Sequence, residues 1–535
     1  MAEVSTSSEV GARKTDVGSG ARKVVIVGFM CAGKSRLGRL AAADLGWPLR
    51  DADMILEERL GEPIASFFDR AGERGFRERE EQLVLELLAE PGPAIVPLGG
   101  GAVESEAVRA ALADHEVVYV EVDADIAWER AQRHADDRPL ARDRARFGAL
   151  HAARRPLYES LATAVLADGA EKTGAFVEAL ARHGEGRMVW SAQGYPVWTG
   201  IGLLARADEL LPRGRRFLIA DERVLALHGG ELSATAAATL TVPPGERHKT
   251  LAEAERLLCG LARAGMERSD TLVALGGGVV GDLAGFCAAT YQRGVAVAHV
   301  PTTVVAQVDS AYGGKTGVDL PEAKNYVGAF HQPVAVVTDP AVLATLPGDE
   351  LSAGSAEVLK TALIAGGALW ETVRVLAPLR QVVEQDIDLL TRVVEDCART
   401  KLRVVALDQR DTGFRAALNL GHTFAHALES ATGFGEWRHG EAVALGLLVA
   451  LRVSEQVVGL DPGVREQVVE ALARQGLPVR FSGPAVGELL EHMARDKKRR
   501  AGRRNLVLLR APGDIVVGSE ADEQVLLAAI EELRT

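Results

Sequence analysis

Short apolar runs alternate with helical stretches over roughly the first third of the chain. The runs "KVVIVG", "AIVPLGGG" and "VVYVEV" have the length of buried strands, and segments with helical spacing such as "RLGRLAAADLG" separate them. This alternation is typical of βαβ units built on a parallel sheet. The pattern therefore predicts one α/β domain over residues 23–183, preceded by a polar, disordered tail over residues 1–22.

A second block follows a weaker, more polar stretch. The segment "EKTGAFVEALARHGEGRMVW" holds one more helix and then loses its period, which places a linker at residues 184–189. The runs "RRFLIAD", "TLVALGGG" and "VAHVPTT" are predicted strands with helices between them. Helical spacing then continues almost to the end, as in "AEVLKTALIAGGALWETVRVL". We expect an α/β part over residues 190–350 and an all-α part over residues 351–535.

Composition and charge narrow the functional classes. The chain has 535 residues, more than one hydrophobic core usually serves, so two or three domains are expected. A net charge of -13 argues against an extended nucleic-acid surface, and the sequence has no apolar run long enough for a membrane span. The four cysteines have no CxxC spacing. We expect a cytoplasmic protein; an organelle presequence is the alternative, and Glu3, Glu9 and Asp16 count against it.

The stretch "GFMCAGKS" fits the pattern G-x-x-x-x-G-K-[ST] and lies between a predicted strand and a predicted helix. In that context the N–H groups of the loop and the helix N-terminus cradle phosphates. Gly28 and Gly33 shape the loop, Lys34 adds a positive charge, and the hydroxyl of Ser35 can hold Mg²⁺. The motif predicts a nucleotide site and leaves the acceptor open; a chance glycine-rich turn is the alternative.

Charged residues beyond this loop point to the acceptor. Asp51 and Asp53 in "RDADMI" follow a predicted strand. There one carboxylate can steady Mg²⁺ and the other can accept hydrogen bonds from hydroxyl groups. An isolated pair of this kind can also be a solvated turn. The stretches "GFRERE", "DDRPL" and "ARRPLYES" add Arg77, Arg138 and Arg154, whose forked guanidinium groups suit carboxylates.

Together these motifs resemble shikimate kinase over the first predicted domain. The resemblance implies ATP and Mg²⁺ as cofactors, with Asp51 supporting the metal and Arg138 closing on the transferring phosphate. It implies that Arg77 and Arg154 hold the shikimate carboxylate. Cys31 and Arg36 depart from the usual family residues without removing a catalytic group. The residues implied for shikimate are Asp53, Arg77, Gly100 and Arg154.

A glycine-rich turn after a predicted strand opens the second candidate site. "LGGGVVGD" is a dinucleotide-binding pattern that can also be a purely structural turn. The following "PTTVVAQVDSAYGGKTGVDLPEAKNYVGAFHQP" is loop-like and glycine-rich, and loops on a rigid scaffold are where chemistry concentrates. Its candidate polar residues are Asp309, Lys315, Lys324 and Asn325.

Metal-ligand side chains follow in the helical part. Glu357 and Lys360 are one helical turn apart, and "EWRHGEA" adds His439. One glutamate and two histidines with open positions are typical of a catalytic zinc site. A lone histidine is more often a core or surface residue, but a core has no use for several polar residues on one face. In "FRAALNLGHTFAHALES" the spacing predicts one helical face for Arg415, Asn419, His422 and His426.

Over residues 190–535 these motifs resemble 3-dehydroquinate synthase. The resemblance implies NAD and Zn²⁺ or Co²⁺ as cofactors, with Glu357, His422 and His439 as metal ligands. Arg223 departs from the asparagine often seen near the adenosine. The residues implied around NAD are Asp221, Glu246, Lys249, Gly277, Gly278, Asp282, Thr302, Thr303, Lys315 and Lys324. Those implied around the substrate are Arg293, Asp309, Lys315, Lys324, Asn325, Lys360, Lys401, Arg415, Asn419 and His426, with Lys497 or Lys498 from "RDKKRRAGRRNLVLL".

The implied substrate is a phosphorylated seven-carbon acid, which requires a cage of lysines and arginines in a protein that is acidic overall. The implied reaction is oxidation of an alcohol by NAD, loss of phosphate, re-reduction, ring opening and aldol closure, with His426 and Asn419 handling protons and alkoxide. The chain would then be a bifunctional enzyme of the shikimate route, acting on small molecules and forming a dimer through the synthase half. Two alternatives stay open: another sugar-phosphate cyclase in the second half, or a non-catalytic nucleotide-binding module in the first.

Overall fold

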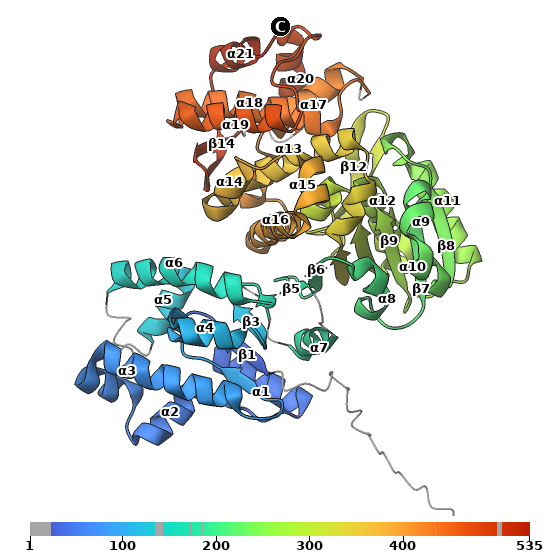
Figure 1. Cartoon of the computed structure of the whole chain (residues 1–535). Coiled ribbons are helices and arrows are strands. Elements are labelled where there is room, and N and C mark those ends of the chain that lie inside the picture. Colours follow the sequence, from blue (N-terminus) through green and yellow to red (C-terminus); the bar gives the residue numbers. More distant parts are fainter. Residues whose placement is uncertain are drawn as a thin grey trace, which may run out of the picture. The chain divides into compact units, whose positions relative to one another are not determined.

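The computed structural model of the chain describes residues 23–133, 143–168, 170–171, 173–182, 186–433, 435–499 and 506–535, with backbone only for 495–499. The chain divides into two compact units (Figure 1). Residues 1–166 and 172–184 belong to the first unit, and residues 167–171 and 185–535 to the second. None of the described helices has the length and apolar composition needed to cross a bilayer.

The first unit is a parallel sheet with helices between its strands. Its strands pair in the order β2-β1-β3-β4, all in parallel. Helix α1 approaches this sheet so closely that a Cβ on Gly38 would lie 2.5 Å from Cγ of Pro97. The elements are β1 (Val24–Val27), α1 (Lys34–Leu45), α2 (Ala52–Leu60), α3 (Ile64–Ala89), β2 (Ile95–Pro97), η1 (Ala102–Glu104), α4 (Glu106–Leu112), β3 (Glu116–Val120), α5 (Ala124–Gln132), α6 (Arg144–Leu161), β4 (Ala164–Leu166) and α7 (Gly174–Arg182).

The second unit begins with an α/β part. Its strands pair in the order β5-β6-β13-β10-β9-β7-β8, and all pairs are parallel except β5 with β6. Every residue of β9 is buried, as expected for a central parallel strand with helices on its faces. The elements are β5 (Arg187–Trp190), β6 (Pro196–Thr199), α8 (Ala207–Leu210), β7 (Arg216–Asp221), α9 (Glu222–His228), α10 (Gly230–Thr235), β8 (Ala238–Val242), α11 (Leu251–Arg263), β9 (Thr271–Gly276), α12 (Gly278–Thr290), β10 (Ala296–Pro301), β11 (Lys315–Leu320), β12 (Ala323–Phe330) and β13 (Ala335–Thr338).

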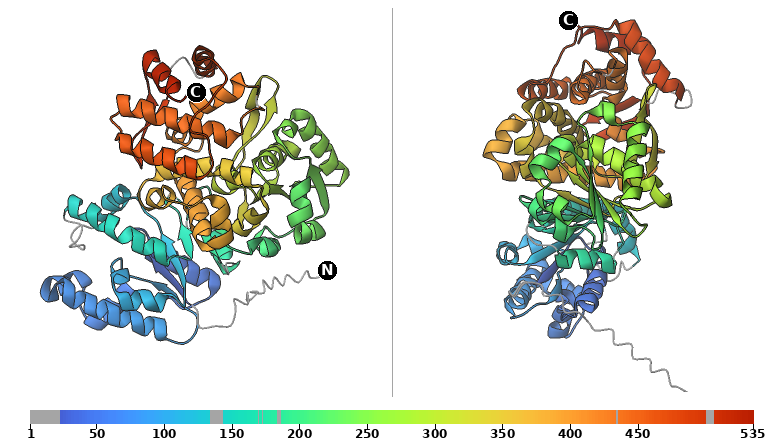
Figure 2. Two further views of the ribbon diagram at one scale, coloured as in Figure 1. Left: turned by 45° about the horizontal axis from the view of Figure 1, so that its top comes forward. Right: turned by 90° about the vertical axis from the view of Figure 1, so that its right-hand side faces the viewer.

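A largely helical part completes the second unit, and its helices gather on one side of that unit's sheet (Figure 2). Helix α18 is its centre, because nearly all of its apolar side chains are buried against neighbouring helices. The predicted fold class, an α/β part followed by a largely helical part, is confirmed, whereas the boundary between residues 350 and 351 stays a prediction. The elements are α13 (Gly348–Ala365), α14 (Gly367–Val373), α15 (Leu379–Gln385), α16 (Ile387–Leu407), η9 (Phe414–Asn419), α17 (His422–Ala431), α18 (His439–Val457), α19 (Pro462–Arg474), α20 (Val486–Arg499), β14 (Leu506–Ala511), β15 (Asp514–Ser519) and α21 (Glu523–Glu531).

Two hairpins differ from the sequence expectation. The glycine-rich segment predicted as loop-like forms the antiparallel pair β11–β12. Its strands lie so close together that a Cβ on Gly328 would be only 2.1 Å from the carbonyl oxygen of Thr316. A second antiparallel pair, β14–β15, lies in the part predicted to be all-α. Its short, apolar β14 is buried in the same core as α18, so its pattern is indistinguishable from that of a buried helix turn.

The single helical face predicted for Arg415 to His426 is wrong. The segment is a 3₁₀ helix, η9, followed by a break at Gly421 and then by α17. Gly421 has φ of 80°, and a Cβ there would lie 2.7 Å from the backbone nitrogen of Leu447. Helix α18 therefore lies against the break, and only glycine fits between them.

The predicted linker at residues 184–189 also needs a correction. Arg187–Trp190 form strand β5, which is paired with β6 in register Arg187 to Thr199 and Trp190 to Pro196. The second unit also takes residues 167–171, where the backbone N–H of Ala167 donates to the carbonyl of Trp190 at 3.1 Å. Sequence pattern missed this because a four-residue strand next to polar residues carries little periodicity.

Candidate active sites

The phosphate-type loop of the first unit joins the end of β1 to the start of α1. The ammonium group of Lys34 donates to the carbonyl oxygens of Gly28 and Phe29 at 2.9 and 3.0 Å. Gly28 has φ of 147°, and a Cβ there would lie 2.6 Å from the carbonyl of Val120. Gly33 precedes the helix with φ of 88°. The N-terminus of α1 therefore opens onto this loop with Lys34 and Ser35 in its first turn, which is an anion-binding arrangement.

Acidic side chains and a glycine turn lie beside this loop. Asp51 is 5% exposed and precedes α2, and its Oδ2 has no hydrogen-bond partner among the described residues. A Cβ on Gly99 would lie 2.9 Å from Oδ1 of Asp53, and one on Gly100 would lie 3.3 Å from the backbone nitrogen of Met30. The glycine turn thus brings the Asp53 carboxylate close to the phosphate-type loop.

The two arginines implied for a substrate carboxylate lie in one cluster with acidic residues of the chain. Arg154 is 1% exposed, and its Nε and Nη2 donate to the two oxygens of Glu104 at 3.1 and 2.9 Å. Arg77 Nη1 donates to Glu80 at 2.5 Å, and its Nε lies 3.8 Å from Glu104. Burial raises the pKa of Glu80, and the guanidinium of Arg77 partly opposes that shift.

In the second unit three helices bring together a metal-type donor set. Glu357 is on α13, His422 begins α17 and His439 begins α18. Glu357 Oε1 lies 3.6 Å from Nε2 of His422 and 3.3 Å from Nε2 of His439. One donor atom from each lies within 4.8 Å of the others, a spacing that fits a single ion. The helices can meet here because Gly440 is so close to Ala353 that a Cβ would lie 1.8 Å from its carbonyl oxygen.

The charges around this cluster favour metal binding. Burial and the ammonium group of Lys360 lower the pKa of His422 to about 3, so its imidazole is neutral. Burial opposes ionisation of Glu357, but Lys360 and a hydrogen bond from His439 hold its pKa well below the usual value. Burial would lower the pKa of His439, yet hydrogen bonds to Glu357 and Glu429 outweigh it and raise the pKa to about 9. The cluster thus offers one carboxylate and one neutral imidazole, and must release a proton to offer the second.

A lysine and aspartate cluster continues from the metal-type residues. The ammonium group of Lys360 lies 2.5 Å from Oε2 of Glu357 and 2.9 Å from Oδ2 of Asp309, and Lys401 donates to the other Asp309 oxygen. Burial raises the pKa of Asp309, but the two ammonium groups outweigh burial and lower it to about 2. Arg415 donates to the carbonyls of Gly313 and Gln409 at 2.8 and 2.7 Å. These cations give the site a positive interior suited to an anionic substrate.

The glycine-rich turn between β9 and α12 forms a tight cradle. A Cβ on Gly277 would lie 2.8 Å from the Thr303 side chain, and one on Gly278 would lie 3.1 Å from Oγ of Ser310. Thr302 is 5% exposed, and its hydroxyl has no hydrogen-bond partner within the described part of the chain. A bare backbone at a helix N-terminus beside an unpaired hydroxyl is suited to a dinucleotide pyrophosphate.

Other residues implied for NAD surround this cradle or the adjoining hairpin. Lys249 donates to Asp282 at 2.6 Å and to Asn325 at 2.5 Å. It lies 3.7 Å from Glu246. Asp221 is the last residue of β7, and its carboxylate accepts from the backbone N–H groups of Arg223 and Val224 in the first turn of α9. That carboxylate therefore has a capping role in the fold as well as a position at the carboxyl edge of the sheet, where ligands of open α/β sheets bind.

Comparison with known proteins agrees with this geometry. Residues 239–353 match the family model described as 3-dehydroquinate synthase N-terminal, and residues 354–499 match 3-dehydroquinate synthase C-terminal. A 3-dehydroquinate synthase of Halorhodospira halophila is 45% identical over 342 residues, which are 63% of this chain and 96% of that protein. The chain belongs to the 3-dehydroquinate synthase family. Residues 30–183 match the shikimate kinase family model, so a shikimate kinase domain precedes the synthase.

Two further proteins extend the comparison. A 3-dehydroquinate synthase of Azotobacter vinelandii is 45% identical over 349 residues, 63% of this chain and 94% of that protein. The solved 2-epi-5-epi-valiolone synthase of Streptomyces hygroscopicus, which has NAD⁺ and Zn²⁺ bound, is 26% identical with a TM-score of 0.59. The match covers 64% of this chain and 96% of that one. Both family resemblances drawn from the sequence are confirmed, and both families are enzymes.

Several predicted residues of the synthase pair with residues outside the cluster of Lys360, Lys401 and Asp309, or lie elsewhere on the sheet. Lys315 pairs with Asp411 at 2.5 Å, and Lys324 pairs with Glu429 at 3.1 Å on the far side of His439. Arg293 follows α12, whose 13 residues span about 20 Å, so it lies at the opposite end of that helix from Gly278. Arg138 and the side chain of Lys497 lie outside the described residues.

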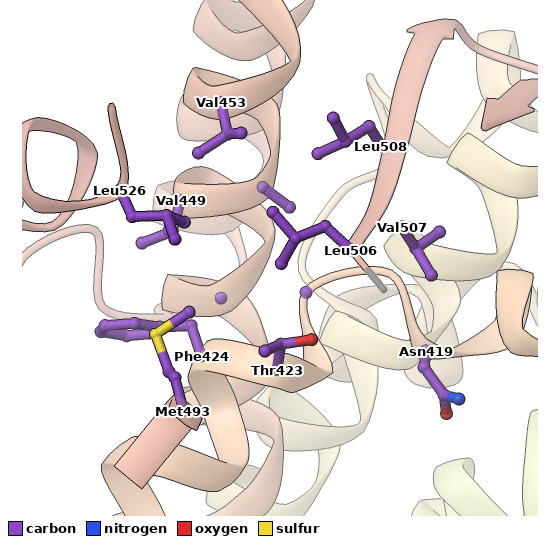
Figure 3. Close-up of a pocket in the computed structure, with 13 residues that line it drawn as sticks. Asn419, Thr423, Phe424, Val449, Val453, Met493, Leu506, Val507, Leu508 and Leu526 are labelled. Atoms are coloured by element: carbon purple, nitrogen blue, oxygen red, sulfur yellow. The ribbon is translucent and has the colours of Figure 1, made fainter. Parts of the chain in front are cut away.

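Asn419 and His426 lie on two sides of the helix break in the synthase. The ring of His426 is 5.5 Å from that of His422, next to the metal-type cluster. Asn419 borders a narrow pocket between α17, α18, α20 and β14, lined mostly by apolar side chains such as Phe424, Met493 and Leu508 (Figure 3). The single predicted face is thus replaced by two segments. The amide of Asn419 lies at the end of η9, and the imidazole of His426 lies on α17.

Two acidic residues were missed by sequence reasoning. Glu104 holds Arg154 in the kinase domain, and Glu429 contacts both His439 and Lys324 in the synthase. Glu429 is 2% exposed, and although burial raises its pKa, His439 and Lys324 outweigh burial and lower the pKa to about 2. Its position in "HTFAHALES", on a helix already carrying two histidines, was the available signal.

Binding of a divalent metal to the metal-free chain is expected to release about one proton near pH 7.5, because His439 has a pKa of about 9 and must bind as neutral imidazole. A raised pKa means that the proton is bound below pH 9 and lost above it, so metal affinity should rise by up to about tenfold per pH unit until that pKa is passed. Titration calorimetry with Co²⁺ in two buffers of different ionisation enthalpy measures the proton count. Glu429→Gln should reduce the count, and a count of zero in the unsubstituted chain would contradict the assignment.

Proposed function

We propose that the chain catalyses two reactions of the shikimate route. The first is ATP-dependent phosphorylation of the 3-hydroxyl of shikimate. The second is NAD- and metal-dependent cyclisation of 3-deoxy-D-arabino-heptulosonate 7-phosphate to 3-dehydroquinate with loss of phosphate. The observation that carries the second is the connected array of Glu357, His422, His439, Lys360 and Asp309, in which a metal-type donor set adjoins buried cations.

For the kinase reaction the chain supplies positioning and charge. The loop from Gly28 to Ser35 fits ATP phosphates because its glycines leave the backbone bare at the N-terminus of α1. Asp51, with a buried oxygen lacking a partner among the described residues, fits a role in holding Mg²⁺. Asp53 would accept a hydrogen bond from the attacking hydroxyl of shikimate, and Lys34 would stabilise the transferring phosphate.

For the cyclisation the chain holds an anionic substrate and moves protons. NAD and a divalent metal, when bound, would supply hydride exchange and polarisation of the reacting oxygen. Glu357, His422 and His439 fit the metal by donor chemistry, and the cradle at Gly277 fits the dinucleotide. Lys360 and Lys401 would bind substrate oxygens, and Asp309 keeps both ammonium groups in place. His426, whose ring lies beside that of His422, would exchange a proton with the substrate.

The direct test is turnover by the purified full-length chain. ADP release that depends on shikimate would support the kinase reaction, and phosphate release from the heptulosonate phosphate that depends on metal would support the cyclisation. Turnover of another sugar phosphate in place of this acid would assign the second half to a different cyclase reaction. If ADP release did not depend on shikimate, the first half would instead be a non-catalytic nucleotide-binding module.

We further propose a cytoplasmic location and a dimer through the synthase half. All four cysteines have free thiols, as is usual in a reducing compartment. Arg293 lies at the amino edge of the sheet, whereas the cradle and the lysines lie at its carboxyl edge. Because Arg293 lies at the opposite edge of the sheet from the site of its own chain, it can contact a substrate only in the site of a second copy.

Two inactive variants of the synthase are therefore expected to complement each other. Arg293→Ala and His422→Ala damage different chains of a shared site, so mixed dimers keep one intact site. Random mixing should restore up to about a quarter of the unsubstituted activity, since about half of the dimers are mixed and each has one working site. Coexpression of the two variants, with each expressed alone as control, measures this. Failure of the mixture to exceed the separate variants would place Arg293 outside the site.

Separate fragments 1–184 and 186–535 are expected to differ in stability. The kinase fragment should fold and phosphorylate shikimate, because it keeps the four parallel strands β2, β1, β3 and β4 and the helices between them. The synthase fragment loses residues 167–171 and the bond from Ala167 to Trp190, so it should melt several degrees below the full chain. A full chain cleaved at an inserted protease site after residue 184 keeps that bond and is the control. Equal melting temperatures of the synthase fragment and the cleaved chain would show that residues 167–171 contribute nothing to the stability of the second unit.

A further inference from the structure

A carboxylate of the chain lies where a substrate carboxylate would bind in the kinase domain. Glu104 ends η1, directly after the glycine turn, and its two oxygens accept from Nε and Nη2 of Arg154 at 3.1 and 2.9 Å. This is the two-pronged geometry by which an arginine binds a carboxylate ligand. Oε2 of Glu104 also lies 3.8 Å from Nε of Arg77. One glutamate thus faces both arginines that the family resemblance implies for shikimate.

The surroundings indicate which partner can move. The Arg154 side chain is 2% exposed, whereas that of Glu104 is 40% exposed. The backbone beneath the glutamate is fixed, because Arg109 donates to the carbonyls of Val103 and Glu104 at 2.9 and 2.7 Å. Nε of Arg77 is buried and has no hydrogen-bond partner among the described residues. Arg154 is therefore a fixed receptor, and the glutamate side chain has room to rotate into solvent.

We propose that Glu104 is an internal competitor that occupies Arg154 in the ligand-free kinase domain and is displaced by the carboxylate of shikimate. The inference rests on the proposed function, which places shikimate at these arginines. Two carboxylates cannot share one guanidinium fork at close range without strong repulsion, so the glutamate must leave when the substrate arrives. The apparent affinity for shikimate is then the intrinsic affinity multiplied by the fraction of molecules in which Glu104 does not bind Arg154. A ligand without a carboxylate gains nothing when Glu104 separates from Arg154. Glu104 therefore also makes the site selective for ligands that carry a carboxylate.

The test compares two ligands on two proteins, using the full chain with ADP present. Glu104→Gln keeps the shape of the side chain and removes its charge, and Glu106→Gln on the exposed first turn of α4 is the matched control. The ligands are shikimate and its uncharged methyl ester, measured by calorimetry. Arg154→Ala identifies which binding signal belongs to the kinase domain.

Glu104→Gln should tighten shikimate binding roughly three- to tenfold, the effect of one partly exposed charge pair. The methyl ester should bind the substituted and unsubstituted chains equally, and Glu106→Gln should change neither ligand. Unchanged or weaker shikimate binding in Glu104→Gln would overturn the inference, as would an equal change for both ligands, which would indicate a general structural effect. Absence of shikimate binding to the unsubstituted chain would instead overturn the proposed function, and this inference with it.

Discussion

Replacing His422 with alanine is expected to abolish metal binding and cyclisation together. The site has one carboxylate and two imidazoles as donors, and His422 is the imidazole that is already neutral, with a pKa of about 3. Losing it leaves Glu357 and a protonated His439, which already form an ion pair at 3.3 Å. Metal affinity should fall by well over about 100-fold, more than the loss of a supporting contact to a metal ligand causes. Metal analysis of the purified variant, with phosphate release from the heptulosonate phosphate, measures both effects.

The controls for this variant come from the same chain. His228→Ala removes another histidine of the second unit, one that contacts Thr345 rather than the metal-type cluster, and should keep its metal and its activity. Kinase activity of His422→Ala should remain, because the two activities reside in separately folded units. Full metal occupancy in His422→Ala would remove this residue from the ligand set.

Replacing Lys34 with alanine is expected to eliminate shikimate phosphorylation and leave cyclisation intact. The Lys34 ammonium lies at the phosphate-type loop, held by the carbonyls of Gly28 and Phe29. Removing a charge that stabilises the transferring phosphate lowers turnover by about 100- to 1,000-fold in comparable cases of lost transition-state contacts. A coupled ADP-release assay with shikimate measures the loss.

The cyclisation rate of the same Lys34→Ala preparation is its internal control. A melting curve that matches the unsubstituted chain would show that the loop still folds. If both activities disappeared in a folded protein, the two units would have to act as one catalytic entity. If phosphorylation survived, the phosphate would have to be bound elsewhere than at the N-terminus of α1.

Local patterns in the sequence determined a large part of this molecule. The phosphate-type loop was predictable because strand, glycine turn, lysine and helix follow one another within a few residues, so their relation is fixed by local geometry. The alternation of apolar runs and helical spacing predicted the α/β and helical parts. Residue type singled out Glu357 and several histidines, since side chains with metal-binding chemistry are conspicuous on otherwise apolar helices. The family resemblance then implied His422 and His439 as the two histidine ligands. Their separation of up to 82 positions along the chain did not by itself show that they meet.

Contacts between distant segments were decided only by the tertiary structure. Helix α18 breaks the segment before α17 at Gly421, because a backbone 26 positions later leaves no room for a side chain there. Glu104 meets Arg154 across 50 positions, and Glu429 meets Lys324 across 105. Strand β5 forms because β6 offers it a partner. Periodicity records which face of an element is apolar, but burial and charge pairing depend on which other element covers that face, and that is a property of the packed chain.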